Sequence, residues 1–331
     1  MQTDNSDNLP LPSVSILLPI RNEKIFINKT LKSILSQDYP QEKLELVIAD
    51  GNSNDGTIKE IKKIKKQFYK IKILHNKHLT MPKGFNLTLK HSKSDIVLML
   101  GGHSDIPYNY ISVCVNNLIK YNADCSGGVI KAKGEGFWGK VIASSISSIF
   151  GVGNVSFRIK NGKSGYVNSV PFGCYKRSVF DKIGMLDENL TRNQDDEFNF
   201  RMIQSGYKIW QDSSLAVIYY SRLSLKKLFI QYLQYGFYKV RVIQKRKALI
   251  SLRHVVPTLF IISLFMPKIS IYIFAIYLLL GLFFSLKINK LNIFKVIASL
   301  LTFFIIHVSY GVGFLFGLFR FINFWKNDEN R

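Results

Sequence analysis

The feature that most constrains this sequence is a long stretch without acidic side chains. No Asp or Glu occurs between Asp212 and Asp328, whereas the same stretch holds fifteen lysines and arginines and nearly all of the long apolar runs. The formal net charge of the whole chain is +23, so this stretch supplies most of it. Because the cations lie beside apolar runs, the pattern predicts a membrane-bound part and favours anionic lipids over nucleic acid as partners.

Three apolar runs follow one another in this part, at Val255–Met266, Ile269–Leu286 and Val296–Phe319. A helix needs about 20 residues to cross a bilayer, so the first run is short and the third is long enough. Three lysines separate the second and third runs, and the positive-inside rule places them in the cytoplasm. Two short crossings or a re-entrant hairpin before these lysines would satisfy that placement, and a buried helix is the alternative for the first run.

The stretch Leu223–Arg253 mixes eight cations with aromatic and aliphatic side chains. This mixture predicts an amphipathic helix in the headgroup layer, with its cations on lipid phosphates. We therefore expect a globular domain over residues 1–222, an interfacial helix over 223–253, and a transmembrane region with two or three membrane segments over 254–331. The chain is then a multi-pass protein of the cell membrane.

The cysteines and the N-terminus indicate the compartment. Cys114, Cys125 and Cys174 are widely spaced and fit neither a disulfide framework nor a CxxC metal pair, so we expect reduced thiols. Residues Met1–Asn8 are polar and acidic, without the basic and apolar regions of a signal peptide. The domain over residues 1–222 is therefore expected on the cytoplasmic side.

Short aliphatic runs alternate with stretches of helical spacing in that domain. We expect strands at Val14–Leu18, Leu44–Ala49, Ile71–Leu74 and Ile96–Leu100, and helices at Ile25–Leu35, Ile58–Phe68 and Gly84–Lys90. This alternation predicts an α/β fold with a largely parallel sheet. Ligands of such sheets bind beyond the carboxyl ends of the strands.

Polar residues follow the first two predicted strands, in the segments Pro19–Glu23 and Asp50–Thr57. At a strand end the Asp50 carboxylate can accept a hydrogen bond from a base N–H or a ribose hydroxyl, whereas Asp55 suits the cap of the next helix. Two polar strand ends in register predict a nucleotide pocket.

These two segments resemble the opening of family 2 glycosyltransferases, which have the GT-A fold, and more closely the membrane-associated glucosyltransferases of succinoglycan-type polysaccharide synthesis. The resemblance runs from about Val14 to Lys247 and includes Gly101–Pro107, Arg192–Glu197, Gly206–Trp210 and Tyr219–Arg222. It implies a GT-A-type nucleotide-sugar-binding domain that transfers a sugar from a nucleoside diphosphate sugar, here expected to be a UDP-sugar, usually with inversion.

The same resemblance implies the donor site. The residues expected to contact the donor are Pro19, Arg21, Glu23, Asp50, Lys83, Gly102 and Arg222. Lys83 lies at a predicted helix start, which favours phosphates, and Arg222 has the geometry for bidentate contact with a diphosphate. Each of these two cations has the alternative of a plain surface position, and Arg222 also that of contact with the membrane surface.

Relatives hold a divalent cation with a DxD or DxH motif after the fourth strand. This chain has Gly101–His103 there, so the first carboxylate is missing. His103 and Asp105 are the candidate ligands of an Mn²⁺ or Mg²⁺ cofactor. Imidazole suits Mn²⁺, whereas Mg²⁺ prefers oxygen ligands, so a metal requirement stays open, and a turn-forming role is the alternative for His103.

Asp195 matches the catalytic aspartate of the family and is the candidate general base that deprotonates the acceptor hydroxyl. It follows Gln194, where relatives commonly carry Glu. Asp196 and Glu197 are assigned to the acceptor side, at the start of a helix predicted over Phe198–Ser205. The alternative is that all three acids only stabilise the helix N-terminus.

Two further segments concern the acceptor. The stretch Gly134–Phe157 has apolar positions at helical spacing and suits either a mobile flap over a lipid-linked acceptor or a core helix. Trp138 in this stretch and Tyr238 are assigned to the acceptor side. Tyr238 ends the segment Gln234–Tyr238, which loosely occupies the place of the QxxRW motif of processive relatives, and the loss of its Arg and Trp indicates addition of a single sugar.

We therefore expect an inverting hexosyltransferase that adds one sugar to a lipid-linked saccharide in the synthesis of a cell-surface polysaccharide. The alternatives are a polyprenyl-phosphate glycosyltransferase and a catalytically silent membrane subunit with the same fold. Nucleic acid is not an expected partner, since the sequence before residue 213 has no recognition-helix or aromatic nucleic-acid motif.

Overall fold

The computed structural model describes residues 10–158, 163–247, 251–290 and 292–322. These residues fold into two compact units. The first unit comprises Met1–Val129, Lys163–Leu186 and Phe198–Val217, and the second comprises Ile130–Gly162, Asp187–Glu197 and Ile218–Arg331. The two units are considered one at a time.

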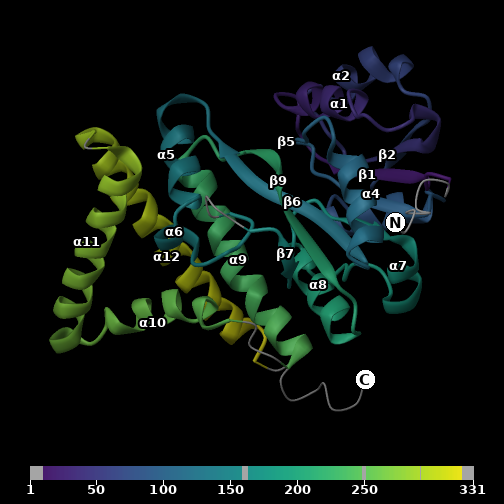
Figure 1. Ribbon diagram of the computed structural model, residues 1–331. Helices are drawn as coiled ribbons and strands as arrows, with labels where there is room; N and C mark the ends of the chain where they lie inside the picture. The colour runs from purple at the N-terminus through teal and green to yellow at the C-terminus, as the bar shows by residue number, and fades with distance from the viewer. Residues whose placement is uncertain (1–9, 159–162, 248–250, 291, 323–331) are drawn as a thin grey trace, which may run out of the picture. The chain divides into compact units, whose positions relative to one another are not determined.

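A mixed sheet forms the centre of the first unit (Figure 1). Its strands are β1 Val14–Ile20, β2 Leu44–Asp50, β3 Ile71–His75, β4 Ile96–Met99, β5 Ser104–Asp105, β6 Cys125–Lys133, β7 Gly165–Val167, β8 Cys174–Lys176 and β9 Ile209–Tyr220. Their order is β3-β2-β1-β4-β8-β6-β9-β5, and β7 pairs with β9. The first four strands are parallel, whereas β8 runs antiparallel to β4 and β6. The expected α/β fold with a mostly parallel sheet is confirmed.

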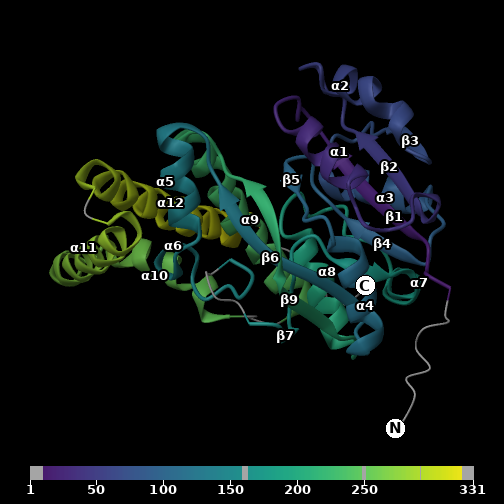
Figure 2. The ribbon, with the colours of Figure 1, turned by 45° about the horizontal axis from the view of Figure 1, so that its top comes forward.

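Helices cover both faces of this sheet (Figure 2). They are α1 Ile27–Leu35, α2 Thr57–Ile64, α3 Met81–Lys90, α4 Tyr110–Lys120, α7 Arg177–Ile183 and α8 Gln194–Gln204, and two 3₁₀ turns lie at Gln41–Lys43 and Lys65–Gln67. Successive strand residues point to opposite faces, so Ile16 packs in the core with α1, α2 and α4, whereas Leu17 packs in the core with α3, α7 and α8. Because both faces are covered, β1 is buried at every position, which explains its largely apolar sequence.

The second unit is largely helical. Its helices are α5 Gly136–Ile146, α6 Ile149–Val152, α9 Leu225–Arg246, α10 Val256–Ser263, α11 Pro267–Asn289 and α12 Ile293–Arg320, with a 3₁₀ turn η3 at Leu252–His254. Helices α9 and α12 approach backbone to backbone: a Cβ added at Gly236 would lie 2.0 Å from the carbonyl oxygen of Tyr310, and one at Gly313 would lie 2.0 Å from that of Leu233. Small residues allow this kind of close packing between apolar helices.

Two helices of the described part, α11 and α12, are long and apolar enough to cross a membrane, at 23 and 28 residues. Helix α10, at 8 residues, is about 12 Å long and therefore shorter than a bilayer core of about 30 Å. It packs on α12 with Phe260 and Ile261 buried, whereas Val256, Leu259 and Ile262 are exposed, so the number of membrane segments stays a prediction.

The Gly134–Phe157 stretch packs against the same helices. The Phe150 ring stacks on Phe284 at 5.4 Å between ring centroids and meets Phe303 edge-on, and its carbonyl oxygen lies 2.8 Å from Nε2 of His307. Phe303 is fully buried. These contacts favour the core-helix alternative over a mobile flap. The three cysteines are buried and unpaired, as the sequence predicts.

Candidate active site

The carboxyl ends of β1 and β2 lie side by side, with Ile20 opposite Asp50 in the parallel register. Asp50 is 9 % exposed, and its carboxylate accepts hydrogen bonds from the Ser53 hydroxyl at 2.6 Å and from the Ser53 N–H at 3.2 Å. The predicted strand-end carboxylate is therefore at the expected edge of the sheet. In this structure it orders its own loop.

Hydrogen bonds join the loops after β1 and β2. The Asn22 N–H donates to Ser53 Oγ at 2.9 Å, and the Asn54 N–H donates to Asn22 Oδ1 at 3.0 Å. Asp55 accepts from the Thr57 N–H, at the first residue of α2, and from the Lys24 N–H, so it serves the start of the helix as expected. The two polar segments found in the sequence thus form one connected surface at the sheet edge.

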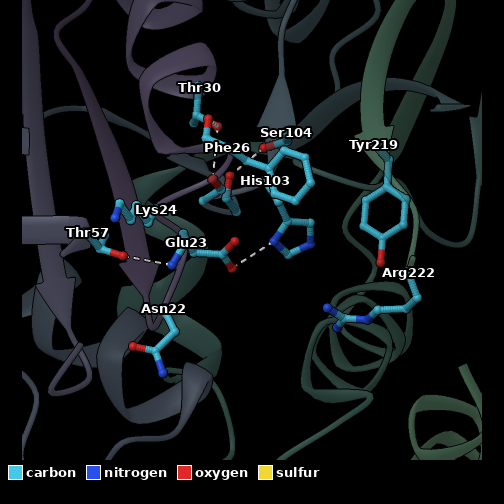
Figure 3. Close-up of polar contacts among 12 residues, drawn as sticks. Asn22, Glu23, Lys24, Phe26, Thr30, Thr57, His103, Ser104, Tyr219 and Arg222 are labelled. Carbon is cyan, nitrogen blue, oxygen red and sulfur yellow. Dashed lines mark hydrogen bonds and ion pairs between the residues drawn. The ribbon is translucent and has the colours of Figure 1, made fainter. Parts of the chain in front are cut away.

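Glu23 connects this surface to the loop after β4. Its carboxylate lies 2.9 Å from Nδ1 of His103, and its N–H donates to Thr57 Oγ1 at 2.8 Å (Figure 3). Gly102 permits the approach: a Cβ there would lie 2.8 Å from Glu23 Cγ and 2.9 Å from Ile20 Cγ2. The predicted donor residues Glu23 and Gly102 and the candidate metal ligand His103 are therefore neighbours.

The metal expectation can be tested on these side chains. Among the described residues no three His, Cys, Asp or Glu side chains converge to hold a metal ion. Nδ1 of His103 is engaged by Glu23, and Asp105 lies in the short strand β5. The described side chains therefore do not form a metal centre by themselves, and His103 and Asp105 would need further ligand oxygens, such as those of a diphosphate.

The other predicted donor residues have different surroundings. Pro19 is buried in β1, whereas Arg21 is exposed just beyond it. Lys83 is half-buried in the first turn of α3, where helix N–H groups favour phosphates. Arg222 belongs to the second unit, where its Nε donates to Gln231 Oε1 of α9 at 3.1 Å.

Helix α8 begins at Gln194, four residues before the predicted start, so Asp195, Asp196 and Glu197 lie in its first turn. The helix dipole favours acidic side chains in a first turn. A sequence pattern therefore cannot distinguish acids that only stabilise the helix from acids with another role. Asp195 Oδ1 accepts the N–H of Asp196 at 2.9 Å, and both side chains are half-buried. Before them, Asn193 has a left-handed backbone with φ 61° and donates from Nδ2 to the Tyr235 carbonyl at 2.9 Å.

The acids beside the candidate base form ion pairs with α9. Asp196 pairs with Lys239, whose side chain is 7 % exposed, and fully buried Glu197 pairs with Arg246. The structure gives both acids partners on α9, and their assignment to the acceptor side stays a prediction. Lys245 pairs with Asp187 in the same way. Three of the cations assigned to lipid phosphates therefore bind carboxylates of the protein.

These surroundings set the two carboxyl groups apart. Burial and the negative charge of Asp196 raise the pKa of Asp195 above its ordinary value. Burial alone would also raise the pKa of Asp196, but the charge and hydrogen bond of Lys239 hold it below the ordinary value. Asp195 is thus the more basic of the two neighbours, as a general base requires.

Sequence reasoning missed the residues of α9 that support this turn. Besides Lys239 and the Tyr235 carbonyl, Gln234 contributes, since its Oε1 accepts from Arg192 Nε at 2.9 Å. Lys239 and Arg246 are seven residues apart in α9, and no local sequence pattern links them to the acids at 196 and 197.

The two aromatic residues assigned to the acceptor side are half-buried in the second unit. Trp138 lies in α5 and meets Phe137 edge-on at 5.4 Å, and Tyr238 lies in α9 and meets Phe237 edge-on at 5.1 Å. Their assignment to the acceptor stays a prediction.

Comparisons with known proteins identify the family and the fold. The model of the family described as glycosyl transferase family 2 matches residues 15–184. Over 243 residues the chain is 29 % identical to the dolichyl N-acetyl-α-D-glucosaminyl phosphate 3-β-D-2,3-diacetamido-2,3-dideoxy-β-D-glucuronosyltransferase of Methanococcus voltae, covering 70 % of this chain and 74 % of the relative. Over 256 residues it is 26 % identical to the succinoglycan biosynthesis protein ExoA of Rhizobium meliloti, covering 76 % and 77 %.

A solved structure shares the fold. The mannosyltransferase PcManGT from Pyrobaculum calidifontis, in complex with GDP-Man and Mn²⁺, superposes with a TM-score of 0.61 at 15 % identity, over 93 % of this chain and 88 % of that one. The likeness at this identity concerns the fold, which is a GT-A-like α/β domain followed by C-terminal helices.

Proposed function

The chain belongs to glycosyltransferase family 2, and from that premise we propose that it is an inverting enzyme that adds one sugar to a lipid-linked saccharide. The proposed donor is a nucleoside diphosphate sugar, with a UDP-sugar as first choice. One similar protein is named for a dolichyl-phosphate-linked sugar, and another is named for succinoglycan biosynthesis. We place the reaction at the cytoplasmic face of a membrane, in the assembly of a cell-surface polysaccharide.

The environment of Asp195 is the observation that carries this proposal. In an inverting transfer the acceptor oxygen attacks the anomeric carbon, the bond from that carbon to the diphosphate breaks, and a base takes the proton of the acceptor hydroxyl. Asp195 suits the base because its pKa is raised, while Lys239 neutralises the adjacent Asp196. A residue that only capped the helix would need neither feature.

The proposed donor site lies at the sheet edge of the first unit. Asp50 and the joined loops after β1 and β2 offer polar groups for the nucleoside, and Lys83 offers positive charge for the diphosphate. Glu23 and His103 form the other wall of that surface. A divalent cation there would add positive charge against the leaving diphosphate, with His103 and Asp105 as its candidate protein ligands.

Membrane attachment is proposed through α11 and α12. Exposed apolar side chains run along α11, among them Ile271, Tyr272 and Leu279 at 68–73 % exposure. An aqueous surface rarely carries so large an apolar patch. The exposed cations that we expect near lipid headgroups are Lys226 and Lys227 of α9 and Lys247 directly after it.

Mass analysis of lipid products tests the proposal. The purified full chain, in detergent with lipid-linked saccharides and a panel of UDP- and GDP-sugars, should add one sugar mass to the acceptor with one donor. A product on polyprenyl phosphate itself, still formed by Asp195→Asn, would contradict the proposal in favour of a polyprenyl-phosphate glycosyltransferase. Failure to bind or turn over any donor would leave the catalytically silent subunit.

A further inference from the structure

A partly buried polar cluster lies beside Asp196 in the second unit. It is formed by Lys239 of α9, Arg253 and His254 of η3, and Tyr310 of α12. Asp196 interacts electrostatically with Lys239, Arg253 and His254. Tyr310 interacts electrostatically with Asp196 and Arg253. The close packing of Gly236 against the Tyr310 carbonyl fixes α9 and α12 at this point.

Two hydrogen-bonding groups of this cluster have no partner among the described residues. His254 is 6 % exposed, and its Nε2 accepts from Arg253 Nε at 3.4 Å, so the proton of the neutral ring lies on Nδ1. Burial and the charge of Lys239 lower the pKa of His254 to about 3, which keeps the ring neutral. Within the described part of the chain, neither His254 Nδ1 nor the buried Tyr310 hydroxyl has a partner. Buried donors of this kind normally have a hydrogen-bond partner. The occurrence of two such donors in one cluster therefore points to a ligand.

The charges in the cluster favour an anion. Lys239 is matched by Asp196, whereas the Arg253 guanidinium donates to a backbone carbonyl, that of Asn154, at 3.0 Å. The cluster therefore offers one guanidinium charge, an imidazole N–H and a hydroxyl, all of which can donate to oxygen. Phosphate oxygens fit such a set.

Exposed apolar side chains flank Arg253 and His254 of the cluster. Leu252 and Val256, on either side of Arg253 and His254, are 76 % and 59 % exposed, and Leu259 of α10 is 57 % exposed. An anion bound by Arg253 would thus have apolar surface next to it. This combination suits a phosphate that is esterified to a hydrocarbon chain.

We propose that Arg253, His254 and Tyr310 bind the diphosphate of the lipid-linked acceptor, with the lipid chain along Leu252, Val256 and Leu259 and the saccharide directed towards Asp195. This inference rests on the proposed function, because it assigns the phosphate end of the acceptor that Asp195 would deprotonate. It gives the acceptor a recognition site that is independent of the sugar.

Binding of farnesyl diphosphate to the full chain in detergent tests the site. Saturating UDP is added first, so that a diphosphate site for the donor is filled, and affinity is measured by titration with intrinsic fluorescence. Farnesol, inorganic pyrophosphate and phosphatidylglycerol micelles serve as comparison ligands. We expect farnesyl diphosphate to bind best, pyrophosphate to bind more weakly, and phosphatidylglycerol not to compete.

Two variants make the test specific. Tyr310→Phe removes only an unpartnered hydroxyl, so it should keep the melting temperature while weakening farnesyl diphosphate about tenfold; Arg253→Gln should weaken it further. Tyr272→Phe, a change of an exposed tyrosine of α11, is the matched control and should bind as the unmodified chain does. UDP affinity should be the same in all three.

Unchanged affinity for farnesyl diphosphate in Tyr310→Phe and Arg253→Gln would overturn the site, since water would then satisfy both buried groups. Equal competition by phosphatidylglycerol would also overturn it, in favour of a general headgroup surface. If the unmodified chain binds both UDP and farnesyl diphosphate with the expected variant pattern but transfers no sugar, the site stands and the proposed function fails.

Discussion

Lys239 of α9, with a 7 % exposed side chain, forms an ion pair with Asp196, the residue directly after the candidate base Asp195. The pair joins two segments that are 43 residues apart in sequence. It neutralises one of two adjacent carboxylates, so that the other keeps a raised pKa without a second uncompensated charge beside it. A helix that the sequence assigns to lipid phosphates therefore also positions the first turn of α8.

The acid limb of the pH–activity profile should shift in one direction when Lys239 is neutralised and in the opposite direction when Asp196 is neutralised. Asp195 acts as a base only when ionised, so activity falls as the pH drops through its pKa. Lys239→Met removes a charge that lowers that pKa, so the acid limb should move to higher pH. Asp196→Asn removes a charge that raises it, so the limb should move to lower pH.

Profiles of kcat/KM against pH measure both shifts. Lys226→Met, which removes an exposed cation from the same helix, should leave the limb in place. Breaking a buried pair from one side costs about 3–5 kcal/mol, and less is expected here because Asp196 is 26 % exposed. Shifts of the same sign in both variants would show that Asp195 is not the titrating group.

Replacing the candidate base should separate chemistry from binding. Asp195→Asn keeps the size of the side chain and its place in α8, so UDP affinity should not change. Turnover should fall by about 10²–10⁴, the usual contribution of a positioned general base. Steady-state rates together with UDP titration test this, and a loss below tenfold would remove Asp195 from the role of base.

Two adjacent glycines give a matched test of the donor surface. In Gly102→Ala the new methyl would lie 2.8 Å from Glu23 Cγ, so Glu23 must shift, and we expect UDP affinity to fall about tenfold, which is about 1.4 kcal/mol. In Gly101→Ala the nearest atom, Phe172 Cε1, is 3.6 Å away, an ordinary contact. Calorimetric UDP titration of the pair should show the loss in Gly102→Ala alone. Equal affinities would place the donor away from Glu23.

Metal binding is expected to depend on the nucleotide. No three candidate ligands converge among the described residues, so the chain alone should bind Mn²⁺ weakly, and UDP should supply the missing oxygens. Electron paramagnetic resonance of Mn²⁺ with and without UDP measures this directly. His103→Ala should lower the affinity in the presence of UDP. Tight binding of Mn²⁺ without nucleotide would show that the protein ligand set is complete.

Local sequence patterns sufficed for the parts of the fold that depend on local physics. Strands β1, β2 and β4 are predictable because they are buried almost throughout and therefore read as largely apolar runs, whereas β3 is only partly buried. The segments Pro19–Glu23 and Asp50–Thr57 are predictable because parallel strands bring their carboxyl ends to one edge. Residues that form one connected loop surface, such as Asn22 and Ser53, follow from that placement.

Contacts between residues that are far apart in the sequence could not be predicted from local patterns. Nothing near Lys239 in the sequence indicates that it neutralises Asp196, and a run of cations beside apolar residues also fits a lipid surface. The sequence predicts the start of α8 four residues too late. Asp is a poor helix former within a helix, although it is favoured in a first turn. Tertiary contacts decided both cases.

The packing of α9 on α12 should limit the stability of the second unit. In Gly313→Ala the added methyl would lie 2.0 Å from the Leu233 carbonyl oxygen, which belongs to a rigid helix backbone and cannot rotate away. Overpacking of this kind costs about 1–3 kcal/mol or more, so the melting temperature in detergent should fall by several degrees. Gly165→Ala is the control, because its new methyl meets nothing within 4 Å. Since α9 carries Lys239 and Arg246, Gly313→Ala should also lower turnover while UDP affinity is kept. If the melting temperature and the turnover of Gly313→Ala are unchanged, the close packing of α9 on α12 does not contribute to the stability of the unit or to the activity of Asp195.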